Sequence, residues 1–197
     1  MGTGLLFIGF FFLFDFQIAL KTAGSETVYA ILDIFPDAIG WLLIFIGTLR
    51  ARRHEIKFKP LVPASAVLFA VSVFTVLSET AFFGVFYPDG NPVLALRVAE
   101  VAIHLGELAF SFFLFRAVRA LCKGKKEEKL VRASLNELIQ IAAHGVLFVI
   151  YMALSFALPK STVTSVIYYL EYLFWIAVVW YGAVTLIRCD LNLSAKA

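Results

Sequence analysis

The chain lacks the motifs that mark several common enzyme classes. It contains no Gly-x-Ser-x-Gly, no P-loop and no Gly-rich dinucleotide fingerprint, and nothing in it favours binding to nucleic acid. Charge is also scarce, since only 16% of the 197 residues are charged and 61% are hydrophobic. A soluble domain is about 45–50% apolar. The composition therefore indicates a polytopic membrane protein with one helical domain spanning residues 1–197.

Cysteine is nearly absent, which excludes two further classes. The two cysteines, Cys122 and Cys189, lie at the expected cytoplasmic ends of helices, where a structural disulfide is not expected. Without a Cys-x-x-Cys pair, a quinone-linked thiol oxidoreductase is not favoured. The first 20 residues carry no basic stretch, and Asp15 interrupts their apolar run. We therefore do not expect a cleaved signal peptide.

Long apolar stretches separated by polar breaks predict an all-α bundle. A transmembrane helix needs about 20 mainly apolar residues, and the breaks contain the Gly, Pro and Lys residues that interrupt helices. Six transmembrane helices are predicted, at about 3–20, 28–49, 61–86, 93–120, 136–158 and 163–187.

Basic residues predict the orientation of these helices. Five follow the second helix, seven follow the fourth and two lie in the C-terminal tail, so that fourteen of 17 share one side. The other three are Lys21, Arg97 and Lys160. Because Lys and Arg are enriched in cytoplasmic loops, both termini are predicted to be cytoplasmic. The same loops could bind anionic lipid headgroups.

Seven carboxylates lie within the apolar stretches. An acid at the centre of a lipid-facing helix costs on the order of 2.5–3.5 kcal/mol, so most of these groups should face one another, a basic partner or water. Nearly all fall in the outer half of the predicted topology, which favours an acidic cavity open to the outside. The seven are Asp15, Asp33, Asp37, Glu79, Glu100, Glu107 and Glu171.

The fourth predicted helix carries the clearest polar face. Arg97, Glu100, His104, Glu107 and Ser111 are spaced by three and four residues, which places them on one stripe of a helix. Glu100, His104 and Glu107 offer one nitrogen and two oxygen donors, which suit a divalent metal ion. The alternative is a polar network that only holds helices together.

Other faces combine polar and aromatic residues. Glu171 shares an arc of the sixth helix with Tyr168, Tyr172 and Trp175, which favours a cation site with aromatic walls, although an interfacial aromatic belt is the alternative. Asp33 and Asp37 would guard the mouth of the cavity or stabilise a helix N-terminus.

The fifth predicted helix has a polar face of its own. It carries Asn136, Gln140, His144 and Tyr151, which packing between helices is expected to explain. Glu137, Gln140 and His144 belong to the inner half of the membrane, apart from the acids.

One segment resembles a known group of proteins. The stretch Asp-Ile-Phe-Pro-Asp-Ala-Ile-Gly-Trp at 33–41 is similar to small multi-helix membrane proteins of Gram-positive bacteria, which read Pro-Asp-x-x-Gly-aromatic at the mouth of an early helix. The resemblance implies a bacterial origin and no particular chemistry. The expected architecture also looks like that of the substrate-binding subunits of energy-coupling-factor transporters.

These observations favour a multi-pass protein of a bacterial cytoplasmic membrane that binds a small solute from outside. An excess of acids points to a small cation, an organic cation or a metal ion, and transport could require an energising partner protein. Two alternatives remain. One is an outward-facing metal-dependent hydrolase acting on a lipid-linked or peptide substrate. The other is a non-catalytic accessory or immunity protein.

Overall fold

The computed structural model describes most of the chain. Its backbone is described for residues 2–13, 17–21, 28–33, 37–80, 94–158 and 161–194. Within these ranges, the side chains of residues 17–21, 28–33, 79–80, 94–97, 100 and 194 are not described.

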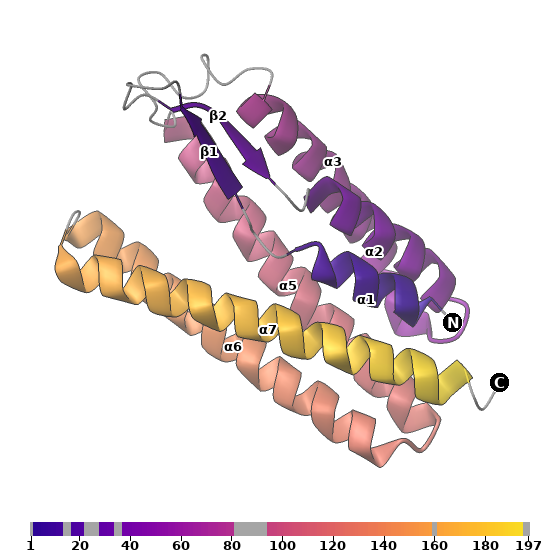
Figure 1. Ribbon diagram of the computed structural model, residues 1–197. Coiled ribbons are helices and arrows are strands. Elements are labelled where there is room, and N and C mark those ends of the chain that lie inside the picture. The colour runs from indigo at the N-terminus through magenta and orange to yellow at the C-terminus, as the bar shows by residue number, and fades with distance from the viewer. Residues whose placement is uncertain are drawn as a thin grey trace.

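Helices dominate the described residues (Figure 1). The short early helices are α1 (Thr3–Phe11) and α2 (Asp37–Ala51), followed by the 3₁₀ turn η1 (Ile56–Phe58). The longer helices are α3 (Leu61–Thr80), α5 (Leu94–Gly124), α6 (Glu128–Ala157) and α7 (Thr162–Ser194). The helices α5, α6 and α7 have 31, 30 and 33 residues, so each is about 45–50 Å long and exceeds the roughly 30 Å hydrocarbon layer.

Four helical segments of the described chain are long and apolar enough to cross a membrane. They are Ile56–Ser78, Val101–Gly124, Glu128–Ala157 and Thr162–Leu193. Their exposed surface carries large apolar side chains, among them Val146, Phe156 and Leu173, which are 62%, 80% and 61% exposed. Lipid tails are a suitable environment for such a surface, whereas large contiguous apolar patches are rare on soluble monomers. The helical class predicted from the sequence is confirmed, while the count of six crossings remains a prediction.

The N-terminal third differs from the two long helices predicted there. The predicted helix at 3–20 ends at Phe11, and the predicted helix at 28–49 begins only at Asp37. Between them, β1 (Gln17–Lys21) pairs antiparallel with β2 (Val28–Asp33), in a register that sets Gln17 opposite Asp33. Pro36 disfavours helix at the residue before it, which is a physical reason for the late start of α2.

The chain ends and the connections divide between two ends of the molecule. In Figure 1 both termini lie at the end that holds the turn between α5 and α6, and the connection from α6 to α7 lies at the opposite end. The helix α6 begins at Glu128, eight residues before the predicted start, because its first turns are amphipathic: Lys129 and Arg132 are exposed, while Leu130 and Ser134 are buried. We call the end with the two termini the basic end, since most Lys and Arg residues belong to its connections.

Close backbone contact joins α1 to α2. A Cβ atom added to Gly9 would lie 2.7 Å from the Gly40 carbonyl oxygen, and one added to Gly40 would lie 2.9 Å from the Gly9 carbonyl oxygen. Real Cβ contacts are not that short, so only glycine permits this approach. The helix α1 also contacts α7, where the Thr3 hydroxyl donates a 2.6 Å hydrogen bond to Asp190.

Two thiols meet between α5 and α7. The Cys122 and Cys189 Sγ atoms are 3.4 Å apart, and both side chains are fully buried. A disulfide bond is about 2.05 Å long, so these two cysteines are free thiols in the structure.

Candidate metal centre

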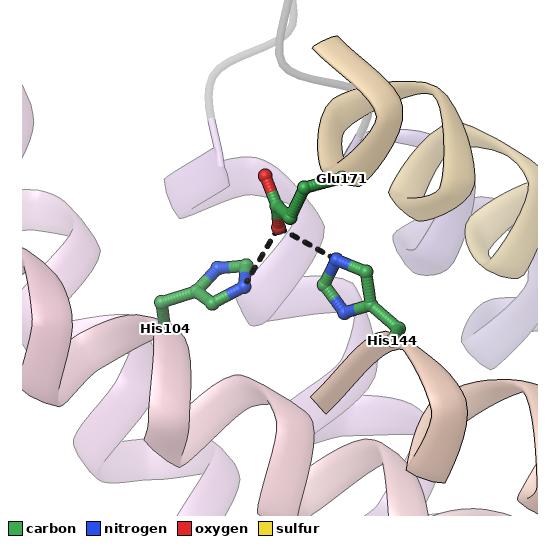
Figure 2. A group of neighbouring side chains, drawn as sticks. All are labelled: His104, His144 and Glu171. Atoms are coloured by element: carbon green, nitrogen blue, oxygen red, sulfur yellow. Dashed lines mark hydrogen bonds and ion pairs between the residues drawn. The ribbon is translucent and has the colours of Figure 1, made fainter. Parts of the chain in front are cut away.

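Three helices bring two histidines and one glutamate together inside the bundle. Figure 2 shows His104 from α5, His144 from α6 and Glu171 from α7 converging on one carboxylate oxygen. Glu171 Oε1 lies 2.7 Å from His144 Nε2 and 3.6 Å from His104 Nε2. We call these three residues the His–His–Glu cluster.

The helical hairpins α5–α6 and α6–α7 determine this convergence. Their polar side chains recur every three or four residues, which keeps them on the inward stripe of each helix. Glu171 lies nine residues after the start of α7, which corresponds to about 14 Å along the helix axis. Half of a typical hydrocarbon layer is about 15 Å. If the outer boundary of the hydrocarbon layer coincides with the start of α7, the cluster would lie near the middle of that layer.

Burial removes the cluster from solvent almost completely. The His144 side chain is 0% exposed, Glu171 9% and His104 22%. Aromatic rings form the wall, and the centroid of the His104 ring lies 4.3 Å from that of Phe148 and 5.5 Å from that of Trp175. In such surroundings a lone charge is costly, and a carboxylate needs a cationic or hydrogen-bonding partner.

A second carboxylate supports His104 from its other side. Glu107, one helical turn along α5, places Oε2 3.9 Å from His104 Nδ1. Its other oxygen, Oε1, accepts a 3.2 Å hydrogen bond from the indole N–H of Trp41 on α2. A carboxylate behind a histidine commonly orients the ring, so that the remaining nitrogen faces a metal. Here that nitrogen is His104 Nε2, which faces Glu171.

The donor set fits a divalent transition metal. One nitrogen or oxygen from each cluster residue lies within 4.8 Å of the others. Around a tetrahedral zinc with bonds of 2.0–2.1 Å, donor atoms lie about 3.3 Å apart, and the two distances to Glu171 are 2.7 and 3.6 Å. Two histidines and a glutamate are the protein ligands of one class of zinc site that leaves the fourth position open. The same trio could instead share a proton.

The structure places the residues predicted for a site in three groups. His104, Glu107 and Glu171 come together, with Trp175 beside both histidines. Two tyrosines of α7 lie one turn apart: Tyr168 is exposed and its ring centroid lies 6.5 Å from that of Tyr172 and 5.5 Å from that of Tyr151. In the third group, Asp37 begins α2, and the other side chains lie outside the described part: Asp15, Asp33, Glu79, Arg97 and Glu100.

Sequence reasoning missed His144. It assigned His144 to helix packing in the inner half, whereas the residue lies 2.7 Å from Glu171. It also grouped Glu100, His104 and Glu107 from one helix as possible metal ligands. The Glu100 side chain lies outside the described part, and the described cluster takes one residue from each of three helices. Spacing along one helix does not report helix tilt or the register between helices. The sequence did contain a signal for the cluster, because two of its three histidines, His104 and His144, lie within apolar stretches.

No family model, curated protein or solved structure matches this chain significantly.

Proposed function

We propose that this protein is a multi-pass membrane protein that binds a divalent transition-metal ion in its interior and carries it across the membrane. The observation that supports the proposal most is the convergence of His104, His144 and Glu171 from three helices. Intramembrane ionisable residues mark ion and substrate pathways by default. Imidazole with carboxylate suits zinc and its neighbours in the first transition series better than Ca²⁺ or Mg²⁺.

Burial favours an ion over a larger substrate. The side chain of His144 is 0% exposed and that of Glu171 only 9%, so a peptide or lipid-linked substrate would have to open the helix bundle to reach them. A small ion can reach these side chains with a much smaller separation of the helices. Asp37 lies one helical turn before Trp41 on α2, and the Trp41 indole reaches Glu107, so Asp37 lies near the level of the cluster and not at an outer mouth. Further out, Glu79 and Glu100 would attract cations, and Tyr168 and Tyr172 could add cation–π contacts.

The setting that we propose is a bacterial cytoplasmic membrane with both termini on the cytoplasmic side. The distribution of Lys and Arg supports this orientation, and so does the position of both termini at one end of the molecule in Figure 1. An energising partner protein would belong to the same proposal, by analogy with the energy-coupling-factor transporters.

The second candidate function is metal-dependent hydrolysis within the membrane. The observation that favours it is the ligand set itself, because two histidines and a glutamate leave a position at which zinc activates water. Zinc uptake into proteoliposomes separates the two functions, since transport predicts uptake by the purified protein and a hydrolase does not.

Zinc titration of the purified full chain tests the cluster. We expect Glu171→Gln to weaken zinc binding by more than roughly 100-fold, beyond the 10–100-fold effect of residues that only support a ligand. Glu128→Gln is the matched control, because Glu128 is an exposed glutamate at the start of α6. Equal zinc affinity in the wild type and in Glu171→Gln would contradict the proposal.

The histidines allow the same comparison. His144→Ala removes a fully buried imidazole from the cluster, and His54→Ala removes an exposed one between α2 and η1. Zinc binding should be lost only in the first variant. Because a cavity at His144 can destabilise the bundle, thermal unfolding without zinc should be measured for both variants, and His144→Asn provides a smaller change in volume.

A further inference from the structure

A second level of buried polar side chains lies between the His–His–Glu cluster and the basic end. Ser111 follows His104 by seven residues on α5, and Glu137 precedes His144 by seven residues on α6. The two histidine rings face each other with centroids 5.4 Å apart. Because α5 and α6 run antiparallel, Ser111 and Glu137 then share a level. Seven residues of helix rise about 10 Å, which is the separation of the two levels.

Within the described part of the chain, each of these side chains has a buried oxygen atom without a hydrogen-bond partner. Glu137 is 2% exposed and Ser111 0%, and neither Glu137 Oε1 nor Ser111 Oγ makes a hydrogen bond. The buried Ser65 and Ser134, in contrast, each donate to a carbonyl of their own helix, Leu61 and Leu130. The Gln140 Oε1 atom, midway between the two levels on α6, is also buried without a partner.

The surroundings of Glu137 are apolar. A Cβ atom added to Gly182 on α7 would lie 3.2 Å from Glu137 Oε1, 3.2 Å from Phe10 Cε1 and 3.0 Å from Phe115 Cζ. The carboxyl oxygen therefore rests against the bare backbone of α7, near one phenyl ring from α1 and one from α5. Gly182 leaves the space that this oxygen occupies.

No ion pair in the described chain includes Glu137. The inward-facing titratable groups on the helices around it are these: His144 on α6, His104, Glu107 and Cys122 on α5, and Glu171, Cys189 and Asp190 on α7, while α1 has none. An ionised carboxylate without a partner is far more costly to bury than a neutral carboxylic acid. This geometry requires Glu137 either to carry a proton or to meet a cation.

We propose that Glu137 is a proton-binding site, with Ser111 and Gln140 beside it, and that it releases its proton when a metal ion occupies the His–His–Glu cluster. The inference rests on the proposed metal function. Both ligands are positive and lie about 10–16 Å apart in a medium of low dielectric constant, so that each opposes the other. The coupling is reciprocal, since a proton at Glu137 must weaken metal binding as much as the metal weakens proton binding. The exchange of a divalent metal for protons would follow.

Proton release during zinc binding tests the coupling. Calorimetric titration of the full chain with zinc, in buffers of different ionisation enthalpy, counts the protons released per zinc bound. We expect Glu137→Gln to release about one proton fewer than the wild type, because a glutamine has none to give. Glu128→Gln, the same change at an exposed site of α6, should match the wild type. Equal release from wild type and Glu137→Gln would overturn the inference.

A measurement without metal separates this inference from the proposed function. Infrared difference spectroscopy at neutral pH detects the carbonyl stretch of a protonated carboxylic acid. The band should be present in the metal-free wild type and in Glu128→Gln, and absent from Glu137→Gln. If the band is the same in all three proteins, Glu137 holds no proton and the site is refuted. If the band behaves as expected but the wild type binds no zinc, the metal function fails and so does the coupling to it.

Discussion

At the residue scale, the account depends on how one carboxylate is held between two imidazoles. Glu171 reaches His144 at 2.7 Å and His104 at 3.6 Å, and both contacts use the same oxygen. A metal ion placed among the three donors would be coordinated by neutral imidazoles and a carboxylate, which is the ligand chemistry of zinc sites. The support behind His104 comes from Glu107 and, through it, from Trp41.

Trp41 is therefore expected to act on the metal site from a distance. Trp41→Phe keeps a buried ring against Phe110, whose centroid lies 5.0 Å from that of Trp41, but removes the hydrogen bond to Glu107. We expect zinc affinity to fall about 10-fold, at the low end of the effect of outer-shell residues. The same calorimetric titration with zinc measures it.

Trp180→Phe is the control for this prediction, because Trp180 is 54% exposed and belongs to the apolar outer surface. It should leave zinc affinity unchanged. If Trp41→Phe and Trp180→Phe bind zinc as tightly as the wild type, the link from Trp41 through Glu107 to His104 has no role in binding.

The sequence predicted the positions of some cluster residues on their helices, but not the contacts between residues of different helices. The spacing of His104 and Glu107 on one helix, and of Glu171 with Trp175 on another, was visible as helical periodicity. The pairing of His144 with Glu171 depends on the register between α6 and α7, which periodicity within one helix cannot supply. The contact of Trp41 with Glu107 joins residues 66 positions apart, so it had no local signal either.

At the element scale, the contact between α1 and α2 should be the most sensitive to added volume. Gly9→Leu would force a side chain into a space where even a Cβ atom would lie 2.7 Å from a carbonyl oxygen. Overpacking typically costs about 1–3 kcal/mol, and separation of two helices places the cost at the upper end. Thermal unfolding in detergent should show a lower midpoint.

Gly145→Ala is the matched control for this prediction. Gly145 also lies inside a helix, and a Cβ atom there would meet nothing within 4 Å. Alanine favours helix over glycine by about 1 kcal/mol, so the midpoint should stay or rise. An equal loss of stability in both variants would contradict the prediction, because the loss in Gly9→Leu could then not be assigned to the close contact between α1 and α2.

The same N-terminal elements show why the predicted helix boundaries failed. Residues 3–20 and 28–49 are apolar enough for helices, and length with hydropathy alone favours two crossings. The strands β1 and β2 instead pair with each other, a choice that depends on contacts between segments. The strand β2 packs against α3, and non-helical backbone at membrane depth is tolerated where protein buries it.

At the scale of the whole molecule, the topology yields a prediction about the two ends. With Cys122 and Cys189 replaced by serine, a cysteine is introduced at Ser161 in the α6–α7 connection or at Lys125 in the α5–α6 turn. A membrane-impermeant maleimide applied to intact cells should label Ser161→Cys, because that end is expected to face outward. Lys125→Cys should be labelled only after the membrane is opened. The reverse pattern would place the basic end outside.

The central claim is that a metal ion binds to His104, His144 and Glu171 in the middle of the bundle. X-ray absorption spectroscopy of the zinc-loaded full chain tests it most directly, because nitrogen and oxygen ligands scatter differently from sulfur, and zinc–sulfur bonds are longer, about 2.3 Å. The account predicts two imidazole ligands with carboxylate oxygen and no sulfur, and loss of the imidazole signature in His144→Asn. Sulfur ligation, which would point to Cys122 and Cys189, or a spectrum unchanged by His144→Asn, would contradict it.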